Sequence, residues 1–357
     1  MAETTPRKGM PDPKLDREAF VARYLEQFHD PAFRRLDGAL AEIAAVAWEA
    51  YDAGRKAPLT RKAGPGFADP DYDLALDWLD ARDAILKAQR EHDDLQRPPR
   101  LLLINAASRS EHTCPGEMSK TWRLTEIARD TATSEGMEVD VLDLSRLSSE
   151  YGRKIYPCKT CFSTAAPLCH WPCSCYPNHS LGQTQDWMNA IYPMWVAAHG
   201  IMIVTPVNWY HTSSPMKLMI DRLVCADGGN PDPTRTHGKD AEAAKKIELE
   251  GWNYPRHLAG RGYSVIVHGD AEGATEVRRA LSDWLSSMEL VPASGACHLE
   301  RYIGYWEPYA TSHTALDRDQ ALLREVEIAA RALARHVRRR RGRETPPDTD
   351  LKEPRQK

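Results

Sequence analysis

From about residue 100 onward, short apolar runs alternate with amphipathic helical patterns, and no other feature limits the fold of this chain so strongly. Runs of this length are typical of strands that are covered on both faces. Strands that alternate with helices predict a parallel sheet with helices on both sides, which is a doubly wound α/β fold. The predicted strands cover residues 101–104, 139–144, 201–204 and 263–268, with a weaker fifth strand near Leu290.

Three amphipathic helical patterns precede this sheet. Asp16 is placed to cap the first helix, and Asp30 followed by Pro31 is a cap signal for the second. Residues 58–70 contain several glycines and prolines, which predicts a loop. A third helix is expected over about 71–94.

The chain therefore divides into three predicted parts. Residues 1–98 form a helical N-terminal extension, and residues 99–338 form the α/β core, which ends in a helix over about 317–337. Residues 339–357 form an Arg- and Pro-rich tail that we expect to be disordered.

Charge and hydropathy exclude several functional classes. Lys and Arg number 47 against 51 Asp and Glu, so the net charge of −4 gives no general electrostatic reason to expect nucleic acid. No stretch approaches the roughly 20 apolar residues of a membrane helix, and the N-terminus lacks the apolar segment of a signal peptide. We therefore expect a cytoplasmic protein with no membrane span.

Hydroxyl side chains and basic side chains follow the first strand of the core. Ser108, Arg109 and Ser110 come directly after it, and the next helix begins near Ser119, Lys120 and Thr121. Hydroxyls and backbone N–H groups at a helix N-terminus form an anion site suited to a phosphate monoester. The Gly-rich motifs of Rossmann folds and of P-loops are absent, which disfavours those modes of nucleotide binding. The plainer alternative is a loop that only caps a helix.

Aromatic side chains and glycines follow the third and fourth strands. After the third strand, an aromatic pair beside a proline and an amide can form a slot for a flat heteroaromatic ring. Gly269, before Asp270, would let backbone approach a ligand closely. The alternatives are an aromatic loop packed on a neighbour and an ordinary surface turn. The residues of the slot are Pro206, Val207, Asn208, Trp209 and Tyr210.

These three loops, together with Ile220-Asp221-Arg222, resemble the flavodoxin-like NAD(P)H-dependent FMN reductase family over residues 100–333. The resemblance implies a flavodoxin-like, five-stranded parallel sheet in the order 2-1-3-4-5. It also implies that residues 108–110 and 119–121 surround the phosphate of FMN, and that Pro206 to Tyr210, Gly269 and Asp270 border its ring system. Two features depart from the family pattern, namely the long loop at 111–118 and the polar insertion at 227–260.

The function that the resemblance implies is an FMN-dependent oxidoreductase. NAD(P)H would reduce FMN and leave, and a quinone, flavin or similar small acceptor would then replace it in a ping-pong cycle. No Ser-His-Asp triad or carboxylate pair is evident, and His211 and His268 are the candidates for proton supply to a quinone. The family also implies a homodimer or homotetramer, because a second subunit commonly completes the flavin edge.

Five of the eight cysteines fall between Cys158 and Cys175. Their spacing suits an iron–sulfur cluster, or zinc together with His170 or His179, although small buried side chains that shape the wall of the site are the favoured interpretation. A metal would favour a rival function, namely a flavoprotein that carries electrons or senses redox state for a protein partner. The candidate ligands are Cys158, Cys161, Cys169 and Cys173.

Overall fold

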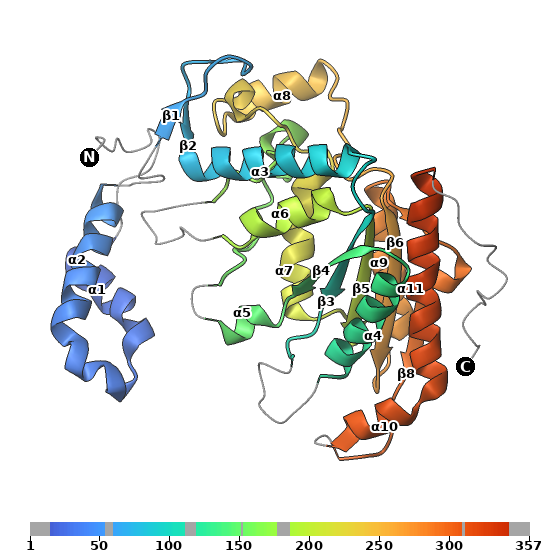
Figure 1. Cartoon of the computed structure of the whole chain (residues 1–357). Helices are drawn as coiled ribbons and strands as arrows, with labels where there is room; N and C mark the ends of the chain where they lie inside the picture. The colour runs from blue at the N-terminus through green and yellow to red at the C-terminus, as the bar shows by residue number, and fades with distance from the viewer. Residues whose placement is uncertain are drawn as a thin grey trace.

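A computed structural model describes residues 15–53, 60–110, 119–150, 153–176, 186–308 and 311–342. Its centre is a parallel sheet in the order β4-β3-β5-β6-β7, with β8 also paired to β6 (Figure 1). Numbered along the core, this is the predicted 2-1-3-4-5 order, and the flavodoxin-like fold is confirmed. The strands are β3 (Arg100–Asn105), β4 (Glu138–Asp143), β5 (Gly200–Pro206), β6 (Gly262–Gly269), β7 (Val291–Pro292) and β8 (His298–Tyr302).

The fifth position of the sheet is shared by two short strands. β7 pairs with Gly262 and Tyr263, and β8 pairs with the stretch from Val265 to Gly269 farther along the same edge of β6. A short 3-10 turn, Gly295–Cys297, separates them. This interruption explains why the sequence near Leu290 gives only a weak strand signal.

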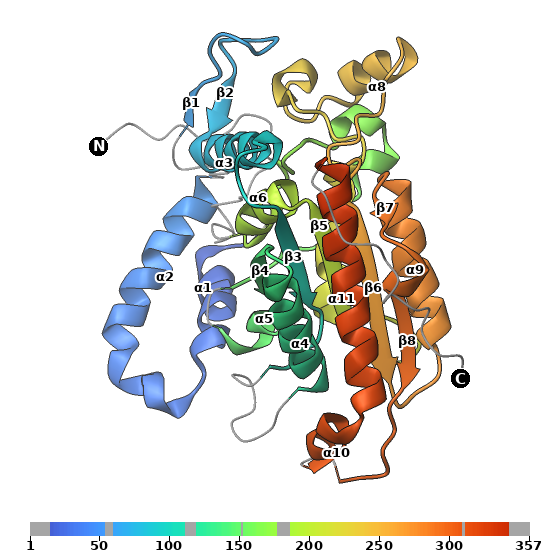
Figure 2. The same ribbon diagram turned by 45° about the vertical axis from the view of Figure 1, so that its right-hand side comes forward.

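Alternate residues of β3 face opposite layers of the molecule. Leu101 and Leu103 pack with α4 (Lys120–Ser134) and α11 (Gln320–Arg340), whereas Leu102 and Ile104 pack on the other side of the sheet. β3 therefore contributes apolar side chains to the hydrophobic cores on both faces of the sheet, as expected for a strand that helices cover on both sides. The layers are visible in Figures 1 and 2. The helices of the second layer are α6 (Met188–Ala197), α7 (Ser214–Leu223) and α9 (Ala274–Ser287).

The helix expected over 317–337 is two helices. α10 (Ser312–Arg318) ends just before Asp319, whose side chain accepts a hydrogen bond from the Leu322 N–H (3.0 Å) and so caps α11. Because α11 continues to Arg340, the first residues assigned to the tail are helical. Residues 343–357 lie outside the described ranges.

The N-terminal region contains the predicted helices, but two of them start later than expected. Asp16 caps α1 (Arg17–Leu25) through a bond from the Ala19 N–H (2.8 Å). Asp30 caps a 3-10 segment, Pro31–Leu36, and α2 (Asp37–Asp52) begins only after it. The aromatic pair Phe20 and Tyr51, with ring centroids 4.7 Å apart, joins α1 to α2.

The segment expected to be a loop contains a strand. β1 (Thr60–Lys62) pairs antiparallel with β2 (Asp73–Ala75), and Lys62 forms an ion pair with Asp73 (3.1 Å). Because β2 occupies these residues, α3 (Leu76–Asp93) starts later than predicted.

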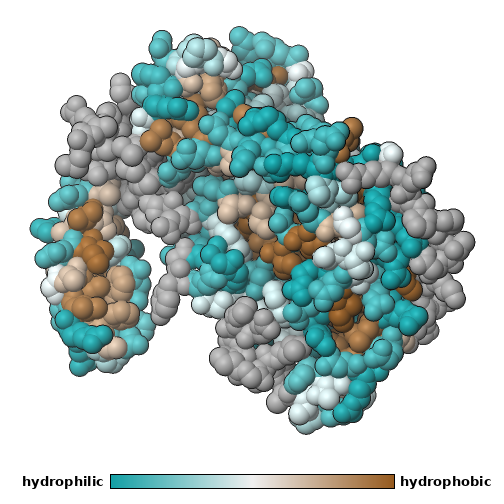
Figure 3. All heavy atoms as spheres, viewed as in Figure 1, coloured by the Kyte–Doolittle hydropathy of each residue, from teal (hydrophilic) through white to brown (hydrophobic). Residues whose placement is uncertain are grey.

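α3 packs on α6, and its residues Ile85 and Ala88 belong to the core on that face of the sheet. α1 and α2 lie to one side of the layered core (Figures 1 and 2). Ile43 and Val46 of α2 are exposed. Figure 3 shows apolar residues gathered on the part of the surface that α1 and α2 form. None of the described helices combines the length and apolar character that a membrane crossing demands.

Candidate functional site

The carboxyl ends of β3, β5 and β6 meet at one edge of the sheet, where a pocket of about 380 Å³ opens. In parallel sheets of this kind, ligands bind beyond the carboxyl ends of strands at the point where the strand order reverses. Ten residues predicted to hold a cofactor line this one pocket: Ser108, Arg109, Ser119, Lys120, Thr121, Pro206, Val207, Asn208, Gly269 and Asp270. Ser110 is buried beside them but does not line the pocket.

One wall of the pocket is the N-terminus of α4. The Ser119 hydroxyl accepts a hydrogen bond from the Trp122 N–H (3.3 Å) and caps the helix. Lys120 and Arg109 add positive charge to the helix dipole, so this wall is suited to an anion. The rest of the loop that joins β3 to α4, residues 111–118, lies outside the described ranges.

His268 lies at the back of the same pocket and is fully buried. Its Nε2 is 2.9 Å from the Thr121 hydroxyl. Burial, helped by the charge of Lys120, lowers the pKa of His268 to about 3, so the ring is neutral at physiological pH. Through its hydrogen bond with the Thr121 hydroxyl, the neutral ring holds that side chain in place at the first turn of α4.

The loop after β3 is held in place by two side chains that the sequence did not mark as functional. The Asn105 amide donates to Asp143 Oδ1 (2.7 Å) and to the Arg109 carbonyl (3.3 Å). Asp143 also accepts from the Ser145 hydroxyl (2.7 Å). Asn105 and Asp143 are paired in the register of β3 and β4. Polar residues at the carboxyl ends of two adjacent strands were therefore the signal that could have identified them.

The predicted aromatic slot is a tight turn. Asn208 and His211 exchange backbone hydrogen bonds of 2.7 and 3.0 Å, and Trp209 and Tyr210 lie between them with φ of 47° and 66°. Left-handed backbone costs bulky residues of order 1–3 kcal/mol, so the surrounding structure must hold the turn in place. Gly273 permits this, because a Cβ there would lie 2.8 Å from the Tyr210 Cα.

The turn projects both aromatic side chains outward. Trp209 is 91% exposed, and Tyr210 is also exposed. Neither lines the 380 Å³ pocket, but Tyr210 and His211 border a larger, neighbouring cavity of about 750 Å³ between α7 and α9. The structure therefore places Pro206 to Asn208 in the pocket and the aromatic pair at its outer margin.

A second exposed tryptophan follows β8. Trp306 is 95% exposed and also has a left-handed backbone, with φ of 59°. Its loop belongs to the site, because Ile303 and Ser312 line the pocket and Lys120 Nζ lies 5.8 Å from the Tyr305 ring centre. This loop was not predicted from the sequence, because only the segments after the first, third and fourth strands of the core were considered as parts of the site.

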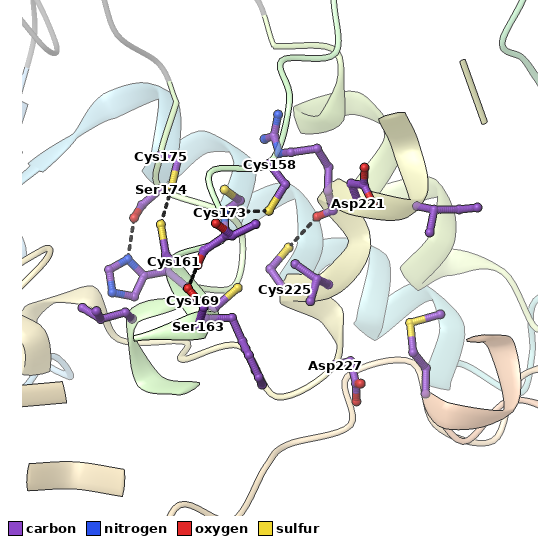
Figure 4. Close-up of a pocket in the computed structure, with 18 of the residues that line it drawn as sticks. Cys158, Cys161, Ser163, Cys169, Cys173, Ser174, Cys175, Asp221, Cys225 and Asp227 are labelled. Carbon is purple, nitrogen blue, oxygen red and sulfur yellow. Dashed lines mark hydrogen bonds between the residues drawn. The ribbon is translucent and has the colours of Figure 1, made fainter. Parts of the chain in front are cut away.

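A separate cavity of about 640 Å³ is bordered by cysteines and by α7 (Figure 4). The Sγ atoms of Cys161 and Cys175 are 3.1 Å apart. Within the described ranges, no three His, Cys, Asp or Glu side chains are arranged to hold a metal ion. His170 instead bonds to the Thr236 hydroxyl (2.8 Å), and His179 lies outside those ranges. The cysteines at this cavity are Cys158, Cys161, Cys169, Cys173, Cys175 and Cys225.

The Ile220-Asp221-Arg222 segment has a structural role at the end of α7. Arg222 is buried, forms an ion pair with Asp186 (2.5 Å) and donates to the Tyr156 carbonyl (2.8 Å). Its guanidinium also lies 4.9 Å from the centre of the Tyr176 ring. Arg222 therefore ties α7 to the segment before α6 and to the cysteine loop.

Several solved structures match this chain at low sequence identity and with TM-scores below 0.5. The structure of RosB with a bound 8-demethyl-8-formylriboflavin-5'-phosphate intermediate is 15% identical, with a TM-score of 0.46, and the match covers 71% of this chain and 83% of that one. A flavone reductase is 16% identical (TM-score 0.39; 70% and 66% covered). An oxidoreductase from Corynebacterium diphtheriae is 14% identical (TM-score 0.37; 68% and 98% covered). The curated proteins gave no match.

The family comparison is more decisive. The family described as NADPH-dependent FMN reductase matches residues 99–301, which is more than half of the chain and includes all three strand-end loops of the pocket. The chain therefore belongs to the NADPH-dependent FMN reductase family.

Proposed function

We propose that the chain is an NAD(P)H-dependent oxidoreductase that uses FMN and passes electrons to a quinone, a flavin or a similar small acceptor in a ping-pong cycle. Bound FMN would supply the hydride chemistry, and the protein would position it and shape its surroundings. The observation that carries the proposal is the convergence of three strand-end loops on one pocket with an anion-binding wall.

The FMN phosphate would bind at the N-terminus of α4. Ser108, Ser119 and Thr121 supply hydroxyls there, and Arg109 and Lys120 supply positive charge. Ser110, buried next to Arg109, would support the loop. An anion at this helix end would be stabilised by the positive end of the helix dipole as well as by the side chains.

The ring system would lie along Pro206, Val207 and Asn208 on one side and Gly269 and Asp270 on the other. A Cβ built on Gly269 would lie 3.2 Å from the Val207 Cβ, so the glycine lets the two loops that border the ring pack closely against one another. The exposed rings of Trp209 and Tyr210 would cover the outer face of the flavin or of the acceptor.

The two histidines have different environments. The hydrogen bond of His268 to Thr121 and its lowered pKa favour a positioning role. His211 is exposed at the edge of the neighbouring cavity and is the better candidate to deliver a proton to a quinone.

The test is an FMN titration of the full-length protein stripped of bound flavin, followed by anaerobic addition of NADH or NADPH. We expect one FMN per chain and rapid bleaching of the yellow colour. Lys120→Met should weaken FMN binding, whereas Lys87→Met, which changes an exposed residue on α3, should not. A protein that takes up no FMN, or equal affinities for the two variants, would contradict the proposed site.

The second candidate is an electron carrier or redox sensor for a protein partner, and the six-cysteine cavity is the observation that favours it. Iron with acid-labile sulfide, together with slow or absent bleaching by NAD(P)H, would support this function over the reductase. Zinc in the purified protein would point to the metal-containing form of the same alternative.

We further propose that the protein acts as a homodimer or homotetramer in the cytoplasm. The exposed apolar side chains of α2, Ile43 and Val46, support self-association, since exposed apolar patches often mark interfaces. The cytoplasmic location follows from the proposed co-substrate, because NAD(P)H is an intracellular reductant. Light scattering of the purified chain gives the oligomeric state directly.

A further inference from the structure

Two thiols and an ammonium group meet at the wall of the cysteine cavity. Cys161 Sγ lies 3.1 Å from Cys175 Sγ, and Figure 4 shows the two sulfur atoms pointing toward one another. Lys239 Nζ lies 3.1 Å from Cys175 Sγ and 3.6 Å from Cys161 Sγ. Because both cysteines line the cavity, a small oxidant inside it can reach either sulfur.

The surroundings make the two thiols unequal. Lys239 Nζ lies closer to Cys175 Sγ (3.1 Å) than to Cys161 Sγ (3.6 Å). A positive charge beside a cysteine favours its thiolate, so Cys175 is placed as the nucleophilic cysteine and Cys161 as the second cysteine that can resolve it.

We propose that Cys161 and Cys175 are a reversible redox pair that is oxidised to an intramolecular disulfide by hydrogen peroxide or an alkyl hydroperoxide. The inference is independent of the flavin site and of the proposed reductase activity. Transient disulfides of this kind are compatible with a cytoplasmic protein.

The chemistry balances in two steps. The Cys175 thiolate attacks one oxygen of the peroxide, the O–O bond breaks, and a sulfenic acid forms. The other oxygen takes up a proton and leaves as water from hydrogen peroxide, or as an alcohol from an alkyl hydroperoxide. Cys161 Sγ then attacks the Cys175 sulfur, the S–S bond forms, and the S–O bond breaks with loss of a second water. The two thiols lose two electrons in total, and hydrogen peroxide is reduced to two molecules of water.

The geometry favours Cys161 over Cys173 as the resolving residue. A disulfide bond is about 2.05 Å long, so the sulfurs of Cys161 and Cys175 need to approach by only about 1 Å. Cys173 is separated from Cys175 by a single residue, and a bridge between them would close a very small ring with poor disulfide geometry.

The first experiment measures the bond itself. The reduced full-length protein is treated with stoichiometric hydrogen peroxide, quenched with an alkylating agent and mapped by mass spectrometry. We expect a mass loss of two hydrogens, a linkage between Cys161 and Cys175, and reversal by dithiothreitol. Cys161→Ser and Cys175→Ser should abolish the linkage, whereas Cys297→Ser, in the core on the opposite face of the sheet, should leave it intact.

The second experiment tests the role of Lys239. Lys239→Met should slow alkylation of Cys175 at pH 7 by about tenfold, because loss of the ammonium raises the thiol pKa. Lys246→Met, an exposed lysine on α8 (Ala241–Leu249), should leave the rate unchanged. A folded protein with no Cys161–Cys175 linkage, a linkage of Cys175 to Cys173 instead, or iron or zinc bound to these thiols in the purified protein would overturn the proposal.

Discussion

At the scale of single residues, the site is marked by aromatic side chains held in unfavourable backbone. Trp209, Tyr210 and Trp306 all have positive φ, and the two tryptophans are almost fully exposed. A folded chain gains little from such positions by burial, and this supports our proposal that a bound ligand covers the rings of Trp209 and Tyr210.

Trp209→Ala should raise the dissociation constant of FMN by about fivefold, because stacking of one aromatic ring on another contributes about 1 kcal/mol. Trp209→Phe keeps a ring in the same turn and should recover most of the affinity. The measurement is a fluorescence titration of the flavin-free protein. Equal affinities of wild type and Trp209→Ala would mean that the exposed ring does not contact the flavin.

The hydrogen bond between Thr121 and His268 should contribute to the stability of the folded protein. Thr121→Val removes the hydroxyl that pairs with buried His268 and leaves that ring nitrogen unsatisfied, which costs about 1–3 kcal/mol in the free energy of unfolding. Thr121→Ser restores the hydroxyl and should restore most of the stability. Urea unfolding of the flavin-free proteins tests this, and a Val variant as stable as wild type would show that the bond contributes nothing.

At the scale of elements, the sequence predicted the strands of the core well and the N-terminal segments less well. Residues 101–104 and 201–204 are apolar at every position, and short runs of this kind between turn signals are typical of strands buried on both faces. By contrast, the pairing of β1 with β2 depends on partners ten or more residues apart, which local turn signals at Gly64 and Gly66 do not specify.

The buried ion pair between Arg222 and Asp186 should contribute more to the free energy of unfolding than the exposed ion pair on α7. Both side chains are 1% exposed, so Asp186→Asn leaves a buried guanidinium without its counter-charge and should reduce the free energy of unfolding by about 3–5 kcal/mol. The matched control is Asp221→Asn on the same helix, where the exposed pair with Lys217 should contribute less than about 1 kcal/mol. Similar losses in the two variants, measured by urea unfolding, would contradict this difference.

At the scale of the whole molecule, the loops that line the 380 Å³ pocket could be predicted because parallel strands end at the same edge of their sheet. Ser108 and Gly269 are more than 150 residues apart, and topology alone brings them together. Trp306 and Cys225 could not be placed in this way. The first reaches the site from the edge of the sheet, and the second reaches the cysteine cavity from the end of α7.

Buried histidines distributed over the molecule should make its stability depend on pH. Burial lowers the pKa of His92 and of His199 to about 4, and that of His268 to about 3. In the unfolded chain these rings bind protons below about pH 6.5, whereas in the folded chain they stay neutral until the lower value is reached. Acidification across this window therefore favours the unfolded state, and the stability present above pH 6.5 is lost as the pH falls.

Between pH 6.5 and pH 5, buried His268 should contribute a loss that averages about 1.1 kcal/mol per pH unit, and the less deeply buried His92 and His199 a smaller loss each. His92→Gln keeps a donor for the Ala198 carbonyl and removes one titrating ring, so its free energy of unfolding should fall less steeply over this range. His29→Gln, at an exposed position in the N-terminal region, should follow wild type. Urea unfolding at pH 6.5, 5.75 and 5.0 gives the slopes, and parallel curves for wild type and His92→Gln would show that this ring binds its proton equally well in both states.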